Sequence, residues 1–164
     1  MKSLAGLALL LLPAFAFGQA SSAPARPDFS GRWRMVKDKS DFGGFHIPDL
    51  VVQVVDHRDP TMNVHTIETV GNKTTTADVS YFTEGSVAKN VINGHDAESK
   101  AFWDGNTLVI RTDMKDSKNE DVVMEERWEL SEDAQTLTRT SHITTRKGQV
   151  DMKLVSVKEK AGGG

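Results

Sequence analysis

Glu126 and Arg139 form the charged pair in this sequence that is best placed to do chemistry inside a fold. From Val122 to Leu130 every second residue is apolar except Glu126. A four-residue loop after this segment sets Glu126 opposite Arg139, and Trp128 opposite Leu137, on one face of a β-hairpin. A charge on an apolar face needs a partner, because an isolated buried charge is strongly unfavourable. The pair is therefore either a salt bridge that fixes strand register or a polar anchor for a ligand.

Other patterns with catalytic or metal-binding precedent lack the geometry that such chemistry needs. Ser86-Val87-Ala88-Lys89 matches a Ser-x-x-Lys motif, but it begins a predicted strand, where the two side chains point to opposite faces. The acidic run from Asp116 to Asp121 lacks the Asp-x-Asp-x-Asp-Gly order of a calcium loop. The histidines show no metal-ligand spacing: His46, His57, His65, His95 and His142. We predict a protein that is not an enzyme and has no metal site or cofactor.

These residues must be positioned by β-strands. After Asp28 the chain consists of short β-branched and aromatic segments separated by turn residues, and no stretch carries a helical apolar stripe. Ten strands are predicted: Gly31–Val36, Leu50–His57, Met62–Val70, Thr74–Phe82, Val87–Ile92, Ala97–Trp103, Asn106–Thr112, Asp121–Leu130, Gln135–Thr145 and Gln149–Val157. Hairpins between neighbours favour an antiparallel meander closed into a barrel, which has an interior lumen.

A second hairpin also has a predicted register. A two-residue turn at Asp104-Gly105 places Ala101 opposite Leu108 and Ser99 opposite Ile110. Small residues opposite large ones leave space on that face. The space suits either a cavity or tight packing across a barrel.

Two loops carry further expectations. The loop from Ser131 to Ala134 sets the register of the hairpin that contains Glu126, and it turns His142 outward, opposite to Ile143. The longest connection, Lys37–Asp49, contains two glycines beside two aromatic residues. That composition fits a loop that folds over an opening, and equally an ordinary Ω-loop.

The first twenty residues are predicted to be a secretory signal peptide. Lys2 gives a positive start, an apolar run extends from Leu4 to Phe17, and Gly18-Gln19-Ala20 offers a small-residue cleavage site. The apolar run is short for a transmembrane helix. We therefore expect cleavage after Ala20 and a chain with no integral membrane segment after removal of the signal.

The composition indicates the compartment of the protein and excludes one class of partner. The chain has no cysteine, so stability must come from the core and the hydrogen-bond ladders. A formal net charge of −3 gives no electrostatic footprint for nucleic acid. An exported, cysteine-free β domain with this start is typical of a bacterial protein in the periplasm or secreted.

At Gly31-Arg32-Trp33 the chain resembles the lipocalins and the wider calycin superfamily. It is similar to small exported lipocalin-like bacterial proteins in four segments: Asp28–Trp33, Lys39–Gly43, Trp103–Ile110 and Glu126–Ser131. In lipocalins the Trp of Gly-x-Trp plugs the closed barrel end beneath an arginine from a late strand. The resemblance implies that Trp33 is this plug and that Arg139, rather than the outward-alternating Arg127, packs over it.

The sequence also departs from that superfamily. The helix that follows the barrel in lipocalins has no counterpart here, and the first connection is too short for the helical lid of fatty-acid-binding proteins. Heme-binding calycins carry more glycine after the Trp than Arg34-Met35-Val36, and a late inward histidine. The resemblance therefore does not assign a ligand.

We predict an all-β chain with a single antiparallel up-and-down β-barrel of eight to ten strands, lipocalin-like and preceded by a signal peptide. The expected divisions are a signal peptide at 1–20, a leader at 21–28, the barrel at 29–158 and a disordered tail at 159–164. The predicted function is non-covalent binding of a small apolar molecule in the lumen of a monomer. Its predicted site residues are Glu126, Arg139, Trp128, Leu137 and Trp33. The alternative is a structural or envelope-interaction domain whose barrel is filled by side chains.

Overall fold

The computed structural model describes residues 26–160, which form an all-β fold. The strands are β1 (Gly31–Met35), β2 (Leu50–Arg58), β3 (Thr61–Val70), β4 (Lys73–Phe82), β5 (Val87–Ile92), β6 (His95–Asp104), β7 (Thr107–Lys115), β8 (Asp121–Leu130), β9 (Thr136–Thr145) and β10 (Gly148–Lys158). A single 3₁₀ turn, η1 (Lys37–Lys39), follows β1, and residues 26–160 contain no α-helix. The ten predicted strands are confirmed, with ends that differ by at most three residues.

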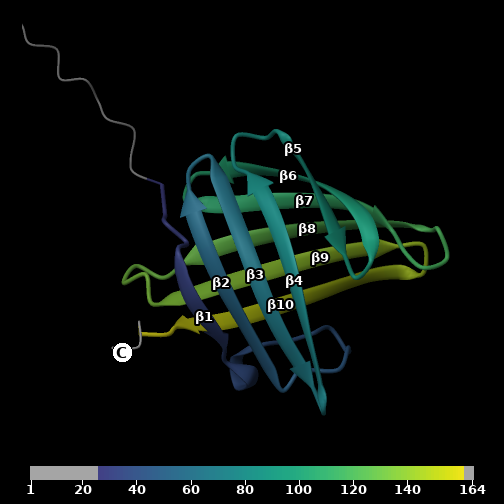
Figure 1. Cartoon of the computed structure of the whole chain (residues 1–164), viewed down its shortest axis with the longest axis horizontal. Helices are drawn as coiled ribbons and strands as arrows, with labels where there is room; N and C mark the ends of the chain where they lie inside the picture. Colours follow the sequence, from purple (N-terminus) through teal and green to yellow (C-terminus); the bar gives the residue numbers. More distant parts are fainter. Residues whose placement is uncertain (1–25, 161–164) are drawn as a thin grey trace, which may run out of the picture.

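The strands form one antiparallel sheet that curls into a nearly closed barrel (Figure 1). Sequence neighbours pair in order, and β1 pairs with both β2 and β10, which joins the two ends of the chain. The order β4-β3-β2-β1-β10-β9-β8-β7-β6-β5 leaves β4 and β5 as the two ends of the sheet. The predicted meander and barrel are confirmed.

Aromatic side chains fill one end of the barrel. Phe29, Trp33, Trp128 and Leu137 are fully buried in the main core cluster. The Trp33 indole Nε1 donates to the Phe29 carbonyl oxygen at 2.8 Å, which fixes the chain entering β1 across the barrel end. Phe29 in turn contacts the Trp128 ring edge-on, with ring centroids 5.8 Å apart. The predicted burial of Trp33 at a closed end is confirmed, and this half of the lumen is packed.

The cation over Trp33 is not the predicted one. The Lys158 ammonium lies 5.2 Å from the centroid of the Trp33 ring, because Lys158 is the residue of β10 that pairs with Trp33. Arg139 is instead stacked on Trp128, which it faces across β8 and β9. Arg127 points outward as expected and pairs with Asp104.

Both predicted hairpin registers are wrong by two residues. The β6–β7 turn is centred on Gly105-Asn106, so Ala101 faces Ile110 and Ser99 faces Thr112. In the β8–β9 hairpin the loop is longer than Ser131 to Ala134: Leu130 pairs with Leu137 and Glu126 with Ser141. Side chains alternate along a strand with a period of two, so a two-residue shift leaves every residue on its predicted face.

An asparagine side chain bridges β4 and β5, the two strands that no backbone ladder joins within residues 26–160. The Ser80 amide donates to Asn90 Oδ1 at 2.9 Å, and Asn90 Nδ2 donates to the Ser80 carbonyl oxygen at 3.0 Å. Asn90 Nδ2 also approaches Ser99 Oγ, which shares a hydrogen bond with Thr112. The carboxamide thus supplies the donor and the acceptor that a paired strand residue would supply.

The predicted signal peptide lies outside the described residues. Within 26–160 there is no helix of the length and apolar character needed to span a bilayer. Just past β10, the Glu159 carboxylate forms ion pairs with Arg32 and Arg34 of β1.

Replacing Trp33 tests the plug. Trp33→Ala is expected to lower the free energy of unfolding by about 3–5 kcal/mol, because it removes a large, fully buried aromatic side chain. Urea denaturation measures the change. Phe45→Ala is the control, since Phe45 is 58% exposed and its removal is expected to change stability by less than about 0.5 kcal/mol. A loss under about 1 kcal/mol for Trp33→Ala would contradict its role as a plug.

Removing the Asn90 side chain tests the bridge. Asn90→Ala leaves the Ser80 amide and carbonyl without their partner, so we expect a loss of about 1–3 kcal/mol in unfolding free energy. Amide hydrogen exchange should accelerate in β4 and β5 and stay unchanged in β8 and β9. Lys89→Ala, one position away on β5, is the control. Uniform acceleration through the barrel would show that the bridge has no local role.

Candidate functional site

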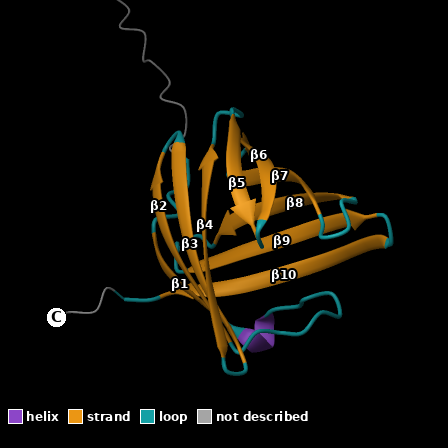
Figure 2. Cartoon of the chain, turned by 45° about the vertical axis from the view of Figure 1, so that its right-hand side comes forward, coloured by secondary structure: helices purple, strands orange, loops and turns teal. Residues whose placement is uncertain are grey.

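The candidate site is a cavity of about 210 Å³ in the unfilled half of the lumen. β8, β9 and β10 supply most of its wall, and the loop after η1 supplies the rest. Figure 2 shows β8, β9 and β10 side by side, with the loop after η1 near β10. Glu126, Arg139 and Ser141 form a polar floor, and the apolar wall consists of Phe42, Met124, Ile143, Met152 and Leu154. Asp41 and Lys153 complete the lining. Few polar groups within apolar walls are the usual composition of a small-molecule pocket.

The polar floor is a buried ion pair. The Arg139 guanidinium donates through Nη2 to Glu126 Oε1, and the Ser141 hydroxyl donates to the same oxygen at 3.2 Å. The side chains of Glu126 and Arg139 are only 3% and 15% exposed. The guanidinium carbon lies 4.3 Å from the centroid of the Trp128 ring, a cation–π distance. The predicted pairing on one inward face is therefore confirmed, with Arg139 one step diagonal to Glu126.

Tyr81 belongs to the same electrostatic environment. It lies on β4, in the wall formed by the first strands, and its side chain is buried in the core. Burial raises the pKa of Tyr81, the negative charge of Glu126 raises it further, and Arg139 opposes part of this rise. The phenol is therefore held in its protonated form.

Two buried donor groups near this floor have no partner. Arg139 Nε and Trp128 Nε1 are both buried and make no hydrogen bond. Buried N–H groups without acceptors are uncommon and costly, since each loses its hydrogen bonds to water.

The loop between β1 and β2 closes one side of the cavity. The Asp41 and Lys153 backbones exchange two hydrogen bonds of 2.7 Å, which attach the loop to the edge of β10, and Phe42 enters the cavity wall. A Cβ at Gly43 would lie 2.4 Å from the Asp151 carbonyl oxygen, and φ there is +59°, so only glycine allows this approach. Of the two alternatives for Lys37–Asp49, the structure supports a loop folded over an opening.

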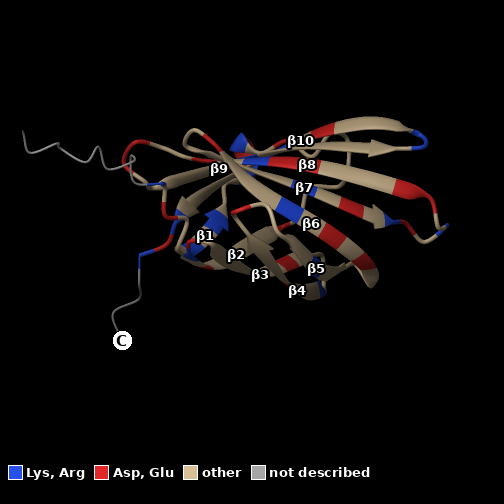
Figure 3. Cartoon of the chain, turned by 90° about the horizontal axis from the view of Figure 1, so that it is seen from above, with Lys and Arg blue, Asp and Glu red and all other residues tan. Residues whose placement is uncertain are grey.

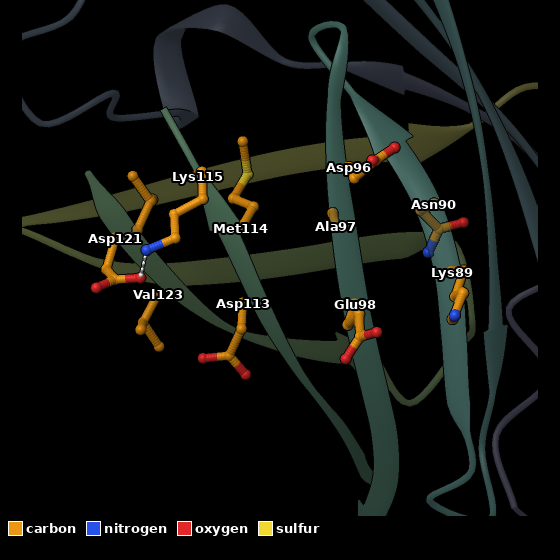
Figure 4. A pocket seen from close by; sticks show the side chains of 11 residues that line it. Lys89, Asn90, Asp96, Ala97, Glu98, Asp113, Met114, Lys115, Asp121 and Val123 are labelled. Atoms are coloured by element: carbon orange, nitrogen blue, oxygen red, sulfur yellow. Dashed lines mark hydrogen bonds and ion pairs between the residues drawn. The ribbon is translucent and has the colours of Figure 1, made fainter. Parts of the chain in front are cut away.

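A wider hollow of about 760 Å³ lies over the ends of β5, β6, β7 and β8 (Figure 4). Its lining includes consecutive residues of each strand, and their side chains point alternately to the two faces of the sheet. The inward-facing members of this lining are Asn90, Ala97, Met114 and Val122. They lie on the same face of the sheet as Ser99, Thr112 and Met124. Val122 lies two positions from Met124 of the smaller cavity. Both hollows therefore include inward-facing residues of β8.

The predicted site residues fall into two layers. Glu126 and Arg139 line the cavity, and Trp128 lies directly beneath Arg139. Leu137 and Trp33 lie deeper, in the packed end. The sequence analysis did not identify Tyr81 or Phe42, or the apolar positions of β10. Alternation through Met152 and Leu154 is the signal that could have found the last group.

The remaining polar candidates have local roles. His142 points outward as expected and pairs with Asp151 at 2.6 Å. The Asp116 carboxylate accepts the amides of Lys118 and Glu120, which folds the tip of the β7–β8 hairpin. The outer faces of β6 and β8 carry more acidic than basic residues (Figure 3).

Comparison with known proteins gives a fold and no family. No protein-family model matches the chain. No curated protein matches it in sequence either. Among solved structures, the zebrafish ileal bile acid-binding protein complexed with cholic acid is similar, with a TM-score of 0.58 and 14% identity over 80% of this chain and 98% of that one. Apo lipid binding protein 8 of Caenorhabditis elegans also has a TM-score of 0.58, with 13% identity over 80% and 95%.

A third similar structure is secretory abundant heat soluble protein 4 from Ramazzottius varieornatus, with a TM-score of 0.54 and 15% identity over 85% of this chain and 100% of that one. These likenesses define the class of fold, an antiparallel β-barrel. At such identities they extend to the fold alone.

Removing one partner of the ion pair tests how deeply it is buried. Arg139→Met leaves the Glu126 carboxylate without its cation, so we expect a loss of about 3–5 kcal/mol in unfolding free energy. The double variant Glu126→Leu/Arg139→Met should be far milder, because no unpaired charge remains. Chemical denaturation of both variants measures the difference. Equal losses in the two variants would contradict this account.

Tyr81 gives a direct pH test because it is the only tyrosine in the chain. Its pKa is raised in the folded state, so the stabilisation is complete below the unfolded pKa of about 10 and is lost as the pH rises above it. We expect tyrosinate absorbance at alkaline pH to appear only together with unfolding. Tyr81→Phe should lose less stability than the wild type above that pH. Tyrosinate forming in the folded protein near pH 10 would contradict the burial.

Proposed function

We propose that this protein binds a small apolar molecule non-covalently in the barrel lumen and does no catalysis. The observation that supports this most directly is the cavity above Glu126 and Arg139, which has apolar walls and a buried ion pair at its floor. Two structures of similar fold are described as a bile acid-binding protein with cholic acid and a lipid binding protein. Binding would depend on apolar burial, with the polar floor orienting the ligand.

The size of the cavity limits the ligand. Drug-sized ligands occupy pockets of about 300–1,000 Å³. The cavity holds about 210 Å³, so it accommodates a short molecule or the head of a longer one. The tail of a longer molecule would extend along β8 into the wider hollow near Met114 and Val122.

We further propose that the protein is exported to the periplasm or secreted, and works as a monomer. The support is the signal-peptide pattern of residues 1–20 and the absence of cysteine. Export would place the barrel where it meets lipids or other apolar compounds outside the cytoplasm.

A second candidate is a structural or envelope-interaction domain that binds no ligand. The packed end of the barrel favours it, since Phe29, Trp33, Trp128 and Leu137 leave no space there. The two candidates differ in whether the unfilled half takes up a probe.

Nile red, an uncharged fluorophore, tests the proposal. We expect its emission to rise and shift to the blue with saturable one-to-one binding to the wild type. Ile143→Trp should fill the cavity and weaken binding at least tenfold, because Ile143 is part of its wall. Val91→Trp is the matched control, since Val91 is 58% exposed on β5. No saturable binding to the wild type, with the barrel intact by circular dichroism, would favour the structural candidate.

A further inference from the structure

We infer that the ligand of this cavity is an uncharged molecule, such as an alcohol, ketone or ester, and not a carboxylate. The inference rests on the proposed function and adds the chemical class of the ligand. It follows from the charges of the cavity lining and from the way they are paired.

The cavity lining has no net charge. Glu126 and Asp41 are its acidic residues, and Arg139 and Lys153 are its basic ones. Asp41 and Lys153 are exposed at the rim, where water screens them. In the interior, Arg139 is the only cation of the lining, and its guanidinium is already paired with Glu126.

A ligand carboxylate that enters the interior of this site would therefore meet no free positive charge there. It would have to displace the Glu126 carboxylate from Arg139, or stay unpaired next to it. Either outcome leaves a buried anion without a partner, which is the most unfavourable arrangement for a charge in a protein interior. An ammonium ligand meets the converse difficulty, because the charge of Glu126 is already paired with that of Arg139.

Three probes of equal chain length separate the alternatives: 1-octanol, octanoate and octylammonium. Each is titrated against the Nile red complex of the wild type at pH 7.5, and each is also measured directly by calorimetry. We expect 1-octanol to bind at least tenfold more tightly than either ion. Octanoate binding as tightly as 1-octanol, or more tightly, would overturn the inference while leaving the proposed function in place. If neither Nile red nor any octyl probe binds, the proposed function itself fails.

Two variants that each remove one negative charge test whether the ion pair causes this preference for an uncharged ligand. Glu126→Gln frees the charge of Arg139 and should raise the affinity for octanoate, relative to 1-octanol, at least tenfold. Glu125→Gln removes the same charge from the exposed outer face and should leave the preference unchanged. An unchanged preference in Glu126→Gln would overturn the inference.

The double variant Glu126→Gln/Arg139→Gln removes both buried charges. It is measured in place of Glu126→Gln if that single variant does not fold. It should still prefer 1-octanol over octanoate, because the interior remains uncharged. A double variant that prefers octanoate would contradict the account.

Discussion

The pairing of Glu126 with Arg139, stacked on Trp128, is the interaction on which the interior of this barrel depends. It places two charges where the strand pattern demands apolar residues, and it does so in contact with the indole that seals the packed end. One face of the guanidinium thus belongs to the core, while its polar edge belongs to the cavity. Any movement of β8 against β9 would break the ion pair and the stacking together, so the pair fixes register as well as chemistry.

The lumen changes character along its length because of this arrangement. Below the ion pair, aromatic rings and Leu137 leave no room for a guest molecule. Above it, Met124, Met152 and Ile143 form a softer wall, and methionine side chains adapt readily to differently shaped molecules. The two alternatives for the barrel, filled or open, are therefore both realised, one in each half. A filled base gives the open half a rigid support.

Local patterns in the sequence were sufficient to predict the strands, their inward faces and the burial of Trp33. Alternation has a period of two, so even hairpins displaced by two residues, such as Leu130 with Leu137, kept Glu126 and Arg139 inside. Loop length could not be predicted, because it depends on side-chain hydrogen bonds such as that of Ser131 to Asp133. Tyr81, Phe42 and Asn90 were missed for another reason: each acts on residues distant in the chain, which come together only when the sheet curls.

The Asn90 bridge has a consequence for how copies of this chain meet. The first and last strands of an uncurled sheet offer free backbone donors and acceptors, and these recruit strands from other molecules into aggregates. At Ser80 the Asn90 carboxamide occupies both groups from within the same molecule. Lys89 and Asp78 add charge along the same two edges. One amide side chain thus occupies part of the free edge of the barrel that a strand from another copy of the chain would otherwise pair with.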